Sequence, residues 1–266
     1  MNTIFQHLKL ISALAAALLF VGCNDHSNSS SLQNTSSEVQ ETGSSGSSEA
    51  DEDVTKKYVS IEDFDSVTIY YPVFSRVDLA TGSMPDKMTD TNVVFCCAAA
   101  FTGEHLLKFK HTNIAGDHVS SGKRYSGYTC KRNSGAFVWY DGQWKFVWND
   151  YSGALDTAAA NGGMGFGQEM IIDKGKLCKT TRRDENVNQF RALCEIEGKL
   201  CIVDCKMEMP FGSFKKQLLA HGATEALYVD MGTGWNHSWY RDENGKAVDI
   251  FPYRHPFCTN WLAFYK

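Results

Sequence analysis

The chain lacks any run or stripe of basic residues. Lysine and arginine together number 26 against 31 aspartates and glutamates, which gives a formal net charge of −5 at pH 7. Most of the acidic excess lies before Lys56, and the remainder of the chain is close to neutral. Nucleic-acid-binding domains carry clustered positive charge, so the sequence argues against nucleic acid as a partner.

The sequence also lacks the residue spacings that mark metal sites. The histidines after residue 56 show neither a His-x-x-x-His nor a His-x-His pattern. Such pairs are how a metal-binding set of side chains is recognised in a sequence. We therefore expect no metal and no cofactor.

No apolar segment reaches the roughly 20 residues that span a bilayer. Lys9 precedes a short apolar run over residues 10–22, which is typical of a signal peptide. Phe20-Val21-Gly22-Cys23 then resembles the bacterial lipobox, in which the cysteine becomes lipidated. We predict a lipoprotein signal peptide over 1–22 and a protein anchored in the bacterial cell envelope through lipid on Cys23. A plain secretory signal and an uncleaved anchor are the alternatives.

Residues 23–55 have few large apolar side chains and are rich in serine, asparagine, glutamate and glycine. Such a segment cannot bury enough surface to offset the loss of conformational entropy on folding. We predict a disordered tether over 23–55. Because no second linker of this kind follows, we predict one domain over 56–266.

Glycine turns between β-type runs organise this domain. Asp141-Gly142, Lys174-Gly175 and Glu197-Gly198 each predict a hairpin. Further strands are expected at 67–74 and 93–101, and a last strand over 259–265 is expected to close the sheet. Only two helices are indicated, one near 154–160 and one with Ser213 as N-cap and Gly222 at its end. The fold class predicted is α+β, a single domain on a large mixed or antiparallel sheet with few helices.

The nine cysteines do not have the spacing of a compact disulfide scaffold or of a Cys-x-x-Cys pair. In an exported chain, disulfide bonds are one interpretation of these cysteines. A two-residue loop at Glu197-Gly198 would place Cys194 and Cys201 directly opposite each other. Cysteines in apolar β patterns also behave as small buried hydrophobic residues. Both interpretations stay open.

The stretch 225–241 carries the strongest functional signal. An apolar strand, 226–229, runs directly into Asp230, and a glycine turn and a polar-aromatic cluster follow. A rigid scaffold presents a sugar-type site in this way. The alternative is a buried aspartate that caps a turn beside core tryptophans.

Together with residues 188–205, this stretch resembles the phosphodiester glycosidase domain family, which includes the mannose 6-phosphate uncovering enzyme and many bacterial proteins. The matching parts are Arg191-Ala192-Leu193, Glu197-Gly198-Lys199, 200–203, 211–222 and Ala226-Leu227-Tyr228-Val229-Asp230. The resemblance covers residues 90–266 and is specific over the last third. Where the family has Asp-Gly-Gly, this chain has Asp230-Met231-Gly232, and methionine does not permit the close backbone approach of glycine.

The resemblance implies a site for a carbohydrate or sugar-phosphate substrate. In it, Asp230 is the sugar-side carboxylate, Glu169 a second acid/base, and Arg191 the phosphate clamp, because a forked guanidinium suits a phosphate. Arg191 has an alternative role, an ion pair with a carboxylate on a neighbouring strand. The expected substrate-binding residues are Gly232, Trp235, Asn236, His237, Ser238 and Trp239.

The glycine-rich segment 161–169 reads as a loop that enters a strand. It lacks the Gly-x-x-x-x-Gly-Lys-Ser/Thr spacing of a nucleotide-binding loop. Its backbone N–H groups could bind an anion, or it could be a plain flexible connection.

Three functions follow from these readings. The first is an envelope-anchored glycosidase that hydrolyses a sugar-1-phosphodiester or a related glycan. The second, favoured by Met231, is a glycan-binding lipoprotein that retains the fold without turnover. The third is a structural envelope protein.

Overall fold

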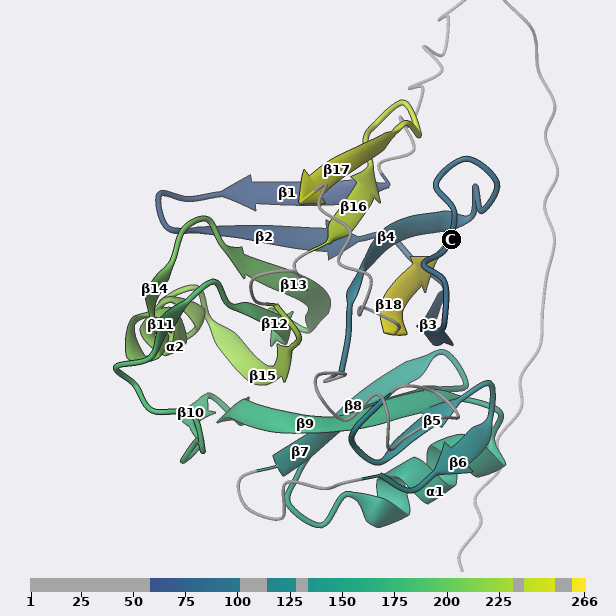
Figure 1. Ribbon diagram of the computed structural model, residues 1–266, viewed down its shortest axis with the longest axis horizontal. Coiled ribbons are helices and arrows are strands. Elements are labelled where there is room, and N and C mark those ends of the chain that lie inside the picture. The colour runs from purple at the N-terminus through teal and green to yellow at the C-terminus, as the bar shows by residue number, and fades with distance from the viewer. Residues whose placement is uncertain (1–57, 101–113, 128–133, 232–236, 252–259) are drawn as a thin grey trace, which may run out of the picture. The chain divides into compact units, whose positions relative to one another are not determined.

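The computed structural model describes residues 58–100, 114–127, 134–231, 237–251 and 260–266 (Figure 1). These residues belong to one compact unit. Within them the chain is mostly strand, every strand pair is antiparallel, and two helices are present. This confirms the predicted fold class, a single domain with large antiparallel sheets and few helices.

The larger sheet has eight strands along its main path and three beside it. In spatial order the path is β1 (Val59–Asp63), β2 (Val67–Pro72), β13 (Lys199–Cys205), β12 (Arg191–Ile196), β15 (Ala223–Val229), β9 (Met164–Asp173), β5 (His118–Ser120) and β6 (Lys123–Tyr125). Off this path lie β7 (Ser134–Tyr140), β8 (Gln143–Trp148) and β10 (Lys176–Leu177).

The second sheet has five strands. Their order is β17 (Ala247–Phe251), β16 (Ser238–Arg241), β4 (Val93–Ala98), β18 (Asn260–Tyr265) and β3 (Arg76–Thr81). The last strand, β18, forms where it was predicted and lies between β4 and β3, so it joins them into one sheet from an inner position. A separate pair joins β11 (Val187–Asn188) to β14 (Met209–Pro210).

The three predicted hairpins form at the glycine turns. Residues Asp141, Lys174 and Glu197 have φ of 50 to 51° and the glycines after them have φ of 69 to 73°. Positive φ at both loop positions is the geometry of a type I′ turn, whose twist matches that of the flanking strands. The register that follows at Glu197-Gly198 sets Cys194 opposite Cys201.

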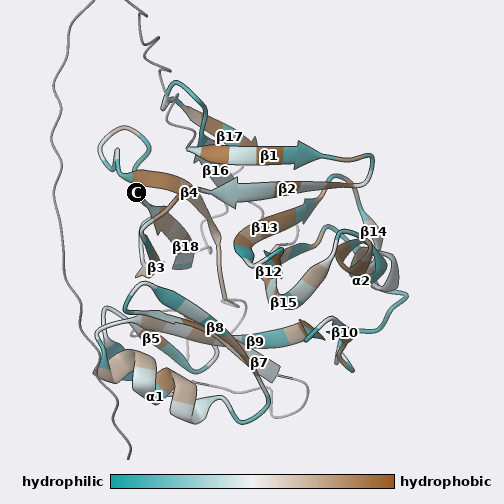
Figure 2. Cartoon of the chain, turned by 180° about the vertical axis from the view of Figure 1, so that it is seen from behind, coloured by the Kyte–Doolittle hydropathy of each residue, from teal (hydrophilic) through white to brown (hydrophobic). Residues whose placement is uncertain are grey.

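The core is divided by the larger sheet. One apolar cluster lies between the two sheets, with Phe95, Leu193, Leu227 and Phe264 among its members. A second lies on the other face of β12, β13 and β15, where a helix covers it. Strand β13 contributes to both of these clusters, whereas β4 contributes to the first and to a third cluster with Trp239 and Trp261. Both strands are largely hydrophobic along their length (Figure 2).

The two helices cover different parts of the larger sheet. Helix α1 (Ser152–Ala160) contacts β5, β7 and β9, and α2 (Phe211–Ala220) contacts β15 (Figure 1). Helix α2 begins after Pro210 and not at Ser213, because carbonyls of Asn186 and Asp184 accept the N–H groups of Phe211 and Gly212. Gly222, with φ of 81°, ends the helical segment as predicted. Neither described helix is long and apolar enough to cross a bilayer.

The glycine-rich segment 161–169 is mostly strand and not a loop. Residues from Met164 onward belong to β9, and the N–H of Gly167 donates to Asp117 O at 2.9 Å. A Cβ on Gly167 would lie 2.8 Å from the Tyr151 hydroxyl, and one on Gly165 would meet Phe137 O at 2.8 Å. Glycine is required at these positions because a side chain would clash with its neighbours. The backbone N–H groups that would have to bind an anion are already used in hydrogen bonds of the strand.

The six described cysteines are all buried; Cys97, Cys178, Cys194, Cys201 and Cys205 are free, and the sixth is Cys96. The Cys201 thiol lies 3.6 Å from the Cys194 carbonyl oxygen. Of the two interpretations of Cys194 and Cys201, a disulfide or small buried hydrophobic residues, the second is correct. Cys23, Cys130 and Cys258 lie outside the described residues.

Candidate functional site

Asp230 lies immediately after β15, where the ends of three strands are joined. Its backbone N–H donates to Ala99 O at 2.7 Å, just beyond β4. The amide side chain of Asn260, at the start of β18, accepts from Ala100 N at 2.7 Å and donates to Ala100 O at 3.0 Å. The sequence predicted that the aspartate would follow the strand. The structure adds two neighbouring strand ends that fix its backbone.

The surroundings of Asp230 are aromatic and charged. Asp230 is 8% exposed, and the preceding Tyr228 donates its hydroxyl to Met231 O at 3.1 Å. Burial raises the pKa of the Tyr228 hydroxyl, while the nearby Arg182 guanidinium lowers it and the carboxylates of Asp230 and Glu169 raise it further. The pKa of this one hydroxyl therefore depends on the charges of Asp230, Glu169 and Arg182.

Glu169 lies on β9 and holds a loop. Its Oε1 accepts the backbone N–H groups of Thr181 and of Arg182, the latter at 3.0 Å. The Arg182 Nε is 4.0 Å from Oε2, and the Glu169 side chain is 11% exposed. Glu169 and Asp230 thus both lie near the Tyr228 hydroxyl, and the Glu169 carboxylate has a positioning role in the loop between β10 and β11.

Arg182 is the residue that sequence reasoning missed. Its guanidinium carbon lies 4.5 Å from the ring centroid of Tyr228 and 5.6 Å from those of Phe190 and Phe211. The side chain keeps 20% of its surface exposed, and within the described part of the chain its Nε has no hydrogen-bond partner. Aromatic faces hold a guanidinium in this way. The adjacent pair Arg182-Arg183 between two short strands was the available signal.

Arg191 is a structural residue and not an open phosphate clamp. Its side chain is fully buried, and it donates from Nε to Asp204 Oδ1 at 2.6 Å and from Nη2 to Asp204 Oδ2 at 2.8 Å. Nη2 also donates to Ser238 Oγ at 2.8 Å. The alternative role, an ion pair with a carboxylate on a neighbouring strand, is the one that the structure has.

The remaining predicted binding residues divide into two groups. Ser238 and Trp239 have no exposed surface and His237 has 4%. Ser238 contacts Arg191, and Trp239 packs in a cluster with Met84, Val93 and Trp261, so a sugar cannot stack on its ring in this arrangement. Gly232, Trp235 and Asn236 lie outside the described residues.

The arrangement at the end of β15 combines three chemical elements: a nearly buried carboxylate, a partly exposed guanidinium and an aromatic surface between them. A carboxylate in such surroundings can stabilise a positive charge that develops on a ligand. A guanidinium can bind a phosphate oxygen. Among the described residues, no group of three histidine, cysteine, aspartate or glutamate side chains is arranged to hold a metal ion.

The two-sheet fold is similar to that of a solved phosphodiester glycosidase catalytic domain. This structure is zebrafish N-acetylglucosamine-1-phosphodiester alpha-N-acetylglucosaminidase, a catalytic domain auto-inhibited by its pro-peptide. The match has a TM-score of 0.53 and 13% identity over 79% of this chain and 82% of that chain. At this identity the likeness shows the fold alone.

A hypothetical protein from Synechocystis is also similar, with a TM-score of 0.49 and 13% identity over 78% of this chain and 61% of that chain. No protein-family model matches the chain, and no curated protein matches it in sequence.

Proposed function

We propose that this protein is a glycosidase that hydrolyses a sugar-1-phosphodiester or a related glycan at the bacterial cell envelope, where lipid on Cys23 anchors it. The observation that carries the proposal is the position of Asp230, at the strand end of a fold shared with a phosphodiester glycosidase. The anchor rests on the sequence around Cys23.

The reaction breaks the bond between the anomeric carbon and the phosphate oxygen. The phosphate monoester leaves with the bonding electrons, water adds its hydroxyl to the anomeric carbon, and the remaining proton passes to solvent or to the phosphate. Positive charge develops on the sugar in the oxocarbenium-like transition state. The carboxylate of Asp230 stabilises that charge, and a phosphate leaves readily enough to need little general-acid help.

Arg182 replaces Arg191 as the phosphate-side cation in this account. Arg191 is fully buried and committed to Asp204, whereas Arg182 is partly exposed and shares the surroundings of Tyr228 with Asp230. Glu169 serves this site by holding the backbone of Thr181 and Arg182, so it acts as a positioning residue.

A second candidate function is glycan binding without turnover. Two observations favour it. Met231, directly after Asp230, is 1% exposed, so its side chain fills space that the glycine of the resembled family would leave open. The Glu169 carboxylate accepts two backbone N–H groups and is not free to act as a second acid or base.

The test uses the purified protein with an α-N-acetylglucosamine-1-phosphodiester and follows release of the reducing sugar. The parent is compared with Arg182→Met and with Arg183→Met, which removes an exposed arginine next to it. The glycosidase account expects release by the parent and by the Arg183 variant, and a large loss in the Arg182 variant. Binding without release at every pH would support the glycan-binding function. Neither binding nor release would reject both.

A further inference from the structure

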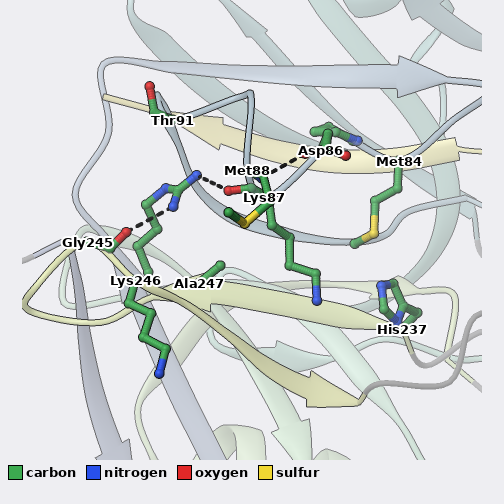
Figure 3. Close-up of a pocket in the computed structure, with 11 residues that line it drawn as sticks. Met84, Asp86, Lys87, Met88, Thr91, His237, Gly245, Lys246 and Ala247 are labelled. Atoms are coloured by element: carbon green, nitrogen blue, oxygen red, sulfur yellow. Dashed lines mark hydrogen bonds between the residues drawn. The ribbon is translucent and has the colours of Figure 1, made fainter.

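A pocket of about 710 Å³ lies between the β3–β4 connection and the β16–β17 hairpin (Figure 3). Its lining includes Met84, Lys87, Met88, His237, Arg241 and Lys246. Lys87 reaches from the β3–β4 connection toward the hairpin, and His237 lies at the end near Met84 (Figure 3). This volume is in the range that small organic ligands occupy.

The floor of the pocket carries a buried positive charge without a carboxylate partner. Arg241 is 5% exposed, and its guanidinium donates only to carbonyl oxygens, those of Val93 and Gly245 at 2.8 and 2.9 Å and of Lys87 and Asp90 at 2.9 and 3.2 Å. Within the part of the chain that is described, it makes no salt bridge. Carbonyl dipoles satisfy its N–H groups but leave the net charge in place.

Two lysines add positive charge at the wall. The Lys87 amine pairs with Asp249 on β17. Lys246 is exposed, and among the described residues no carboxylate lies within 4 Å of its amine. Because Lys246 follows the turn that Arg241 fixes through Gly245, its backbone position is set while its amine can move to a ligand.

The acidic groups around the pocket are largely committed. Asp86 is the one carboxylate in the lining, and its Oδ1 accepts the backbone N–H groups of Met88 at 2.7 Å and Thr89 at 3.0 Å. Asp242, in the hairpin turn, accepts from Asn244 N and Lys246 N. Among the described residues, the lining therefore presents the cations Lys87, Arg241 and Lys246 against the carboxylate of Asp86, and Asp249 on β17 pairs with the first of these cations.

The pocket also has an apolar side. Met84, Pro85, Met88 and Ala247 line it together with the cations, and Met88 is 83% exposed. A bare phosphate ion would fill only a small part of this space. The combination of cations and apolar walls suits a phosphate group that carries a small organic substituent.

We infer that this pocket binds a small phosphate ester, with the phosphate near Lys87 and Lys246 above the Arg241 guanidinium and the organic group against Met84 and Met88. A cleft whose lining has an excess of positive charge attracts ligands of negative charge. The binding requires no turnover at Asp230, so it stands or fails independently of the proposed glycosidase activity.

The experiment is calorimetric titration of the purified protein with glycerol phosphate, inorganic phosphate and glycerol at low ionic strength. Glycerol phosphate binds more tightly than inorganic phosphate, and glycerol gives no heat. Lys246→Met weakens glycerol phosphate binding about fivefold, which is the effect of one charged contact at an exposed site. Added salt weakens it further.

Three further variants make the result specific. Lys87→Met is combined with Asp249→Asn, so that no unpaired carboxylate is left beside the pocket, and this double variant also binds about fivefold more weakly. Lys216→Met, on the exposed face of α2, and Asp230→Asn both bind as the parent does. Arg241 is left intact because it holds two elements together, and melting curves verify that each variant is folded.

Three results would overturn the inference. The first is no heat with glycerol phosphate, and the second is equal binding by the parent and the Lys246 variant. The third is binding that Asp230→Asn abolishes and the lysine variants leave unchanged, because the phosphate would then occupy the Asp230 site. Turnover that is absent while glycerol phosphate still binds contradicts the proposed function only.

Discussion

The Arg191 guanidinium and the Asp204 carboxylate face each other across β12 and β13 with two hydrogen bonds, at 2.6 and 2.8 Å, and both side chains are buried. The same guanidinium reaches Ser238 Oγ at 2.8 Å, on β16 of the second sheet. The guanidinium of this ion pair thus connects the two sheets close to the strand end that bears Asp230. Its role in this position is to hold the two sheets together.

Replacing Arg191 with methionine should lower the free energy of unfolding by about 3–5 kcal/mol, because the Asp204 carboxylate would remain buried without its partner. Denaturant unfolding of the parent and the variant measures the change. The double variant Arg191→Met with Asp204→Leu should lose less than the single variant. If Arg191→Met is stable and selectively loses phosphodiester binding, Arg191 is the phosphate clamp and not a structural residue.

The buried thiols should resist alkylation while the protein is folded. Burial raises the pKa of Cys97 to about 12 and those of Cys178 and Cys205 to about 11, and the thiolate is the reactive form. We expect iodoacetamide at pH 8 to leave Cys97, Cys178, Cys194, Cys201 and Cys205 unmodified in the native protein and to modify them in denaturant, as read by mass spectrometry. Rapid native labelling of Cys97 would contradict its buried position.

Protonation of His118 should destabilise the fold below neutral pH. His118 is 2% exposed and its Nδ1 contacts Gly116 O at 2.8 Å. Burial, helped by the Arg124 charge and opposed by Asp117, holds its pKa below the ordinary 6.5. The unfolded chain therefore binds the proton more strongly, and this contribution to stability, complete above pH 6.5, falls as the pH drops toward the lowered pKa.

The measurement is the free energy of unfolding between pH 7.5 and 5 for the parent and for His118→Gln. The variant should show a shallower loss of stability over this range, since the other titrating groups are common to both proteins. Parallel curves would mean that His118 has an ordinary pKa in the folded state.

Arg182→Met should weaken productive binding of a phosphodiester, since it removes a charged hydrogen-bond donor worth about 2 kcal/mol, which corresponds to roughly a thirtyfold loss in kcat/KM. Arg182→Lys should restore part of it, because the charge remains and the fork is lost. Steady-state kinetics with matched melting curves provide the measurement. If Arg183→Met has the larger effect, the assignment of the cation is wrong.

Local sequence signals predicted the hairpins well. Each of the turns that begin at Asp141, Lys174 and Glu197 is two residues long with glycine as the second residue, so chain geometry alone specifies the pairing. The opposed positions of Cys194 and Cys201 follow from the same rule. Contacts between residues that are close together in the sequence could be predicted from the sequence.

Long-range contacts explain what the sequence could not predict. The start of α2 is set by carbonyls of Asn186 and Asp184, so the N-cap signal at Ser213 was misleading. The glycines of β9 are required by Tyr151 and Phe137, which lie elsewhere in the chain.

The candidate site shows the same limit. Asp230 was predicted from its own strand, whereas the separate roles of Arg191 and Arg182 depend on partners on other strands: Asp204 for the first and Tyr228 for the second. No local pattern distinguishes a buried arginine from a partly exposed one.

The most direct test of the account is the Asp230→Asn variant, measured for sugar release from the phosphodiester and for thermal melting beside the parent. The amide has the size and most of the hydrogen-bonding capacity of the carboxylate but lacks its charge. We expect a melting curve close to that of the parent and a rate at least about a hundredfold lower, since several kcal/mol of transition-state stabilisation are lost. Asp65→Asn, an exposed aspartate in the β1–β2 turn, should change neither quantity. Undiminished sugar release by Asp230→Asn would contradict the catalytic role, and activity that merely follows a collapsed melting curve would make Asp230 a structural cap of the strand end.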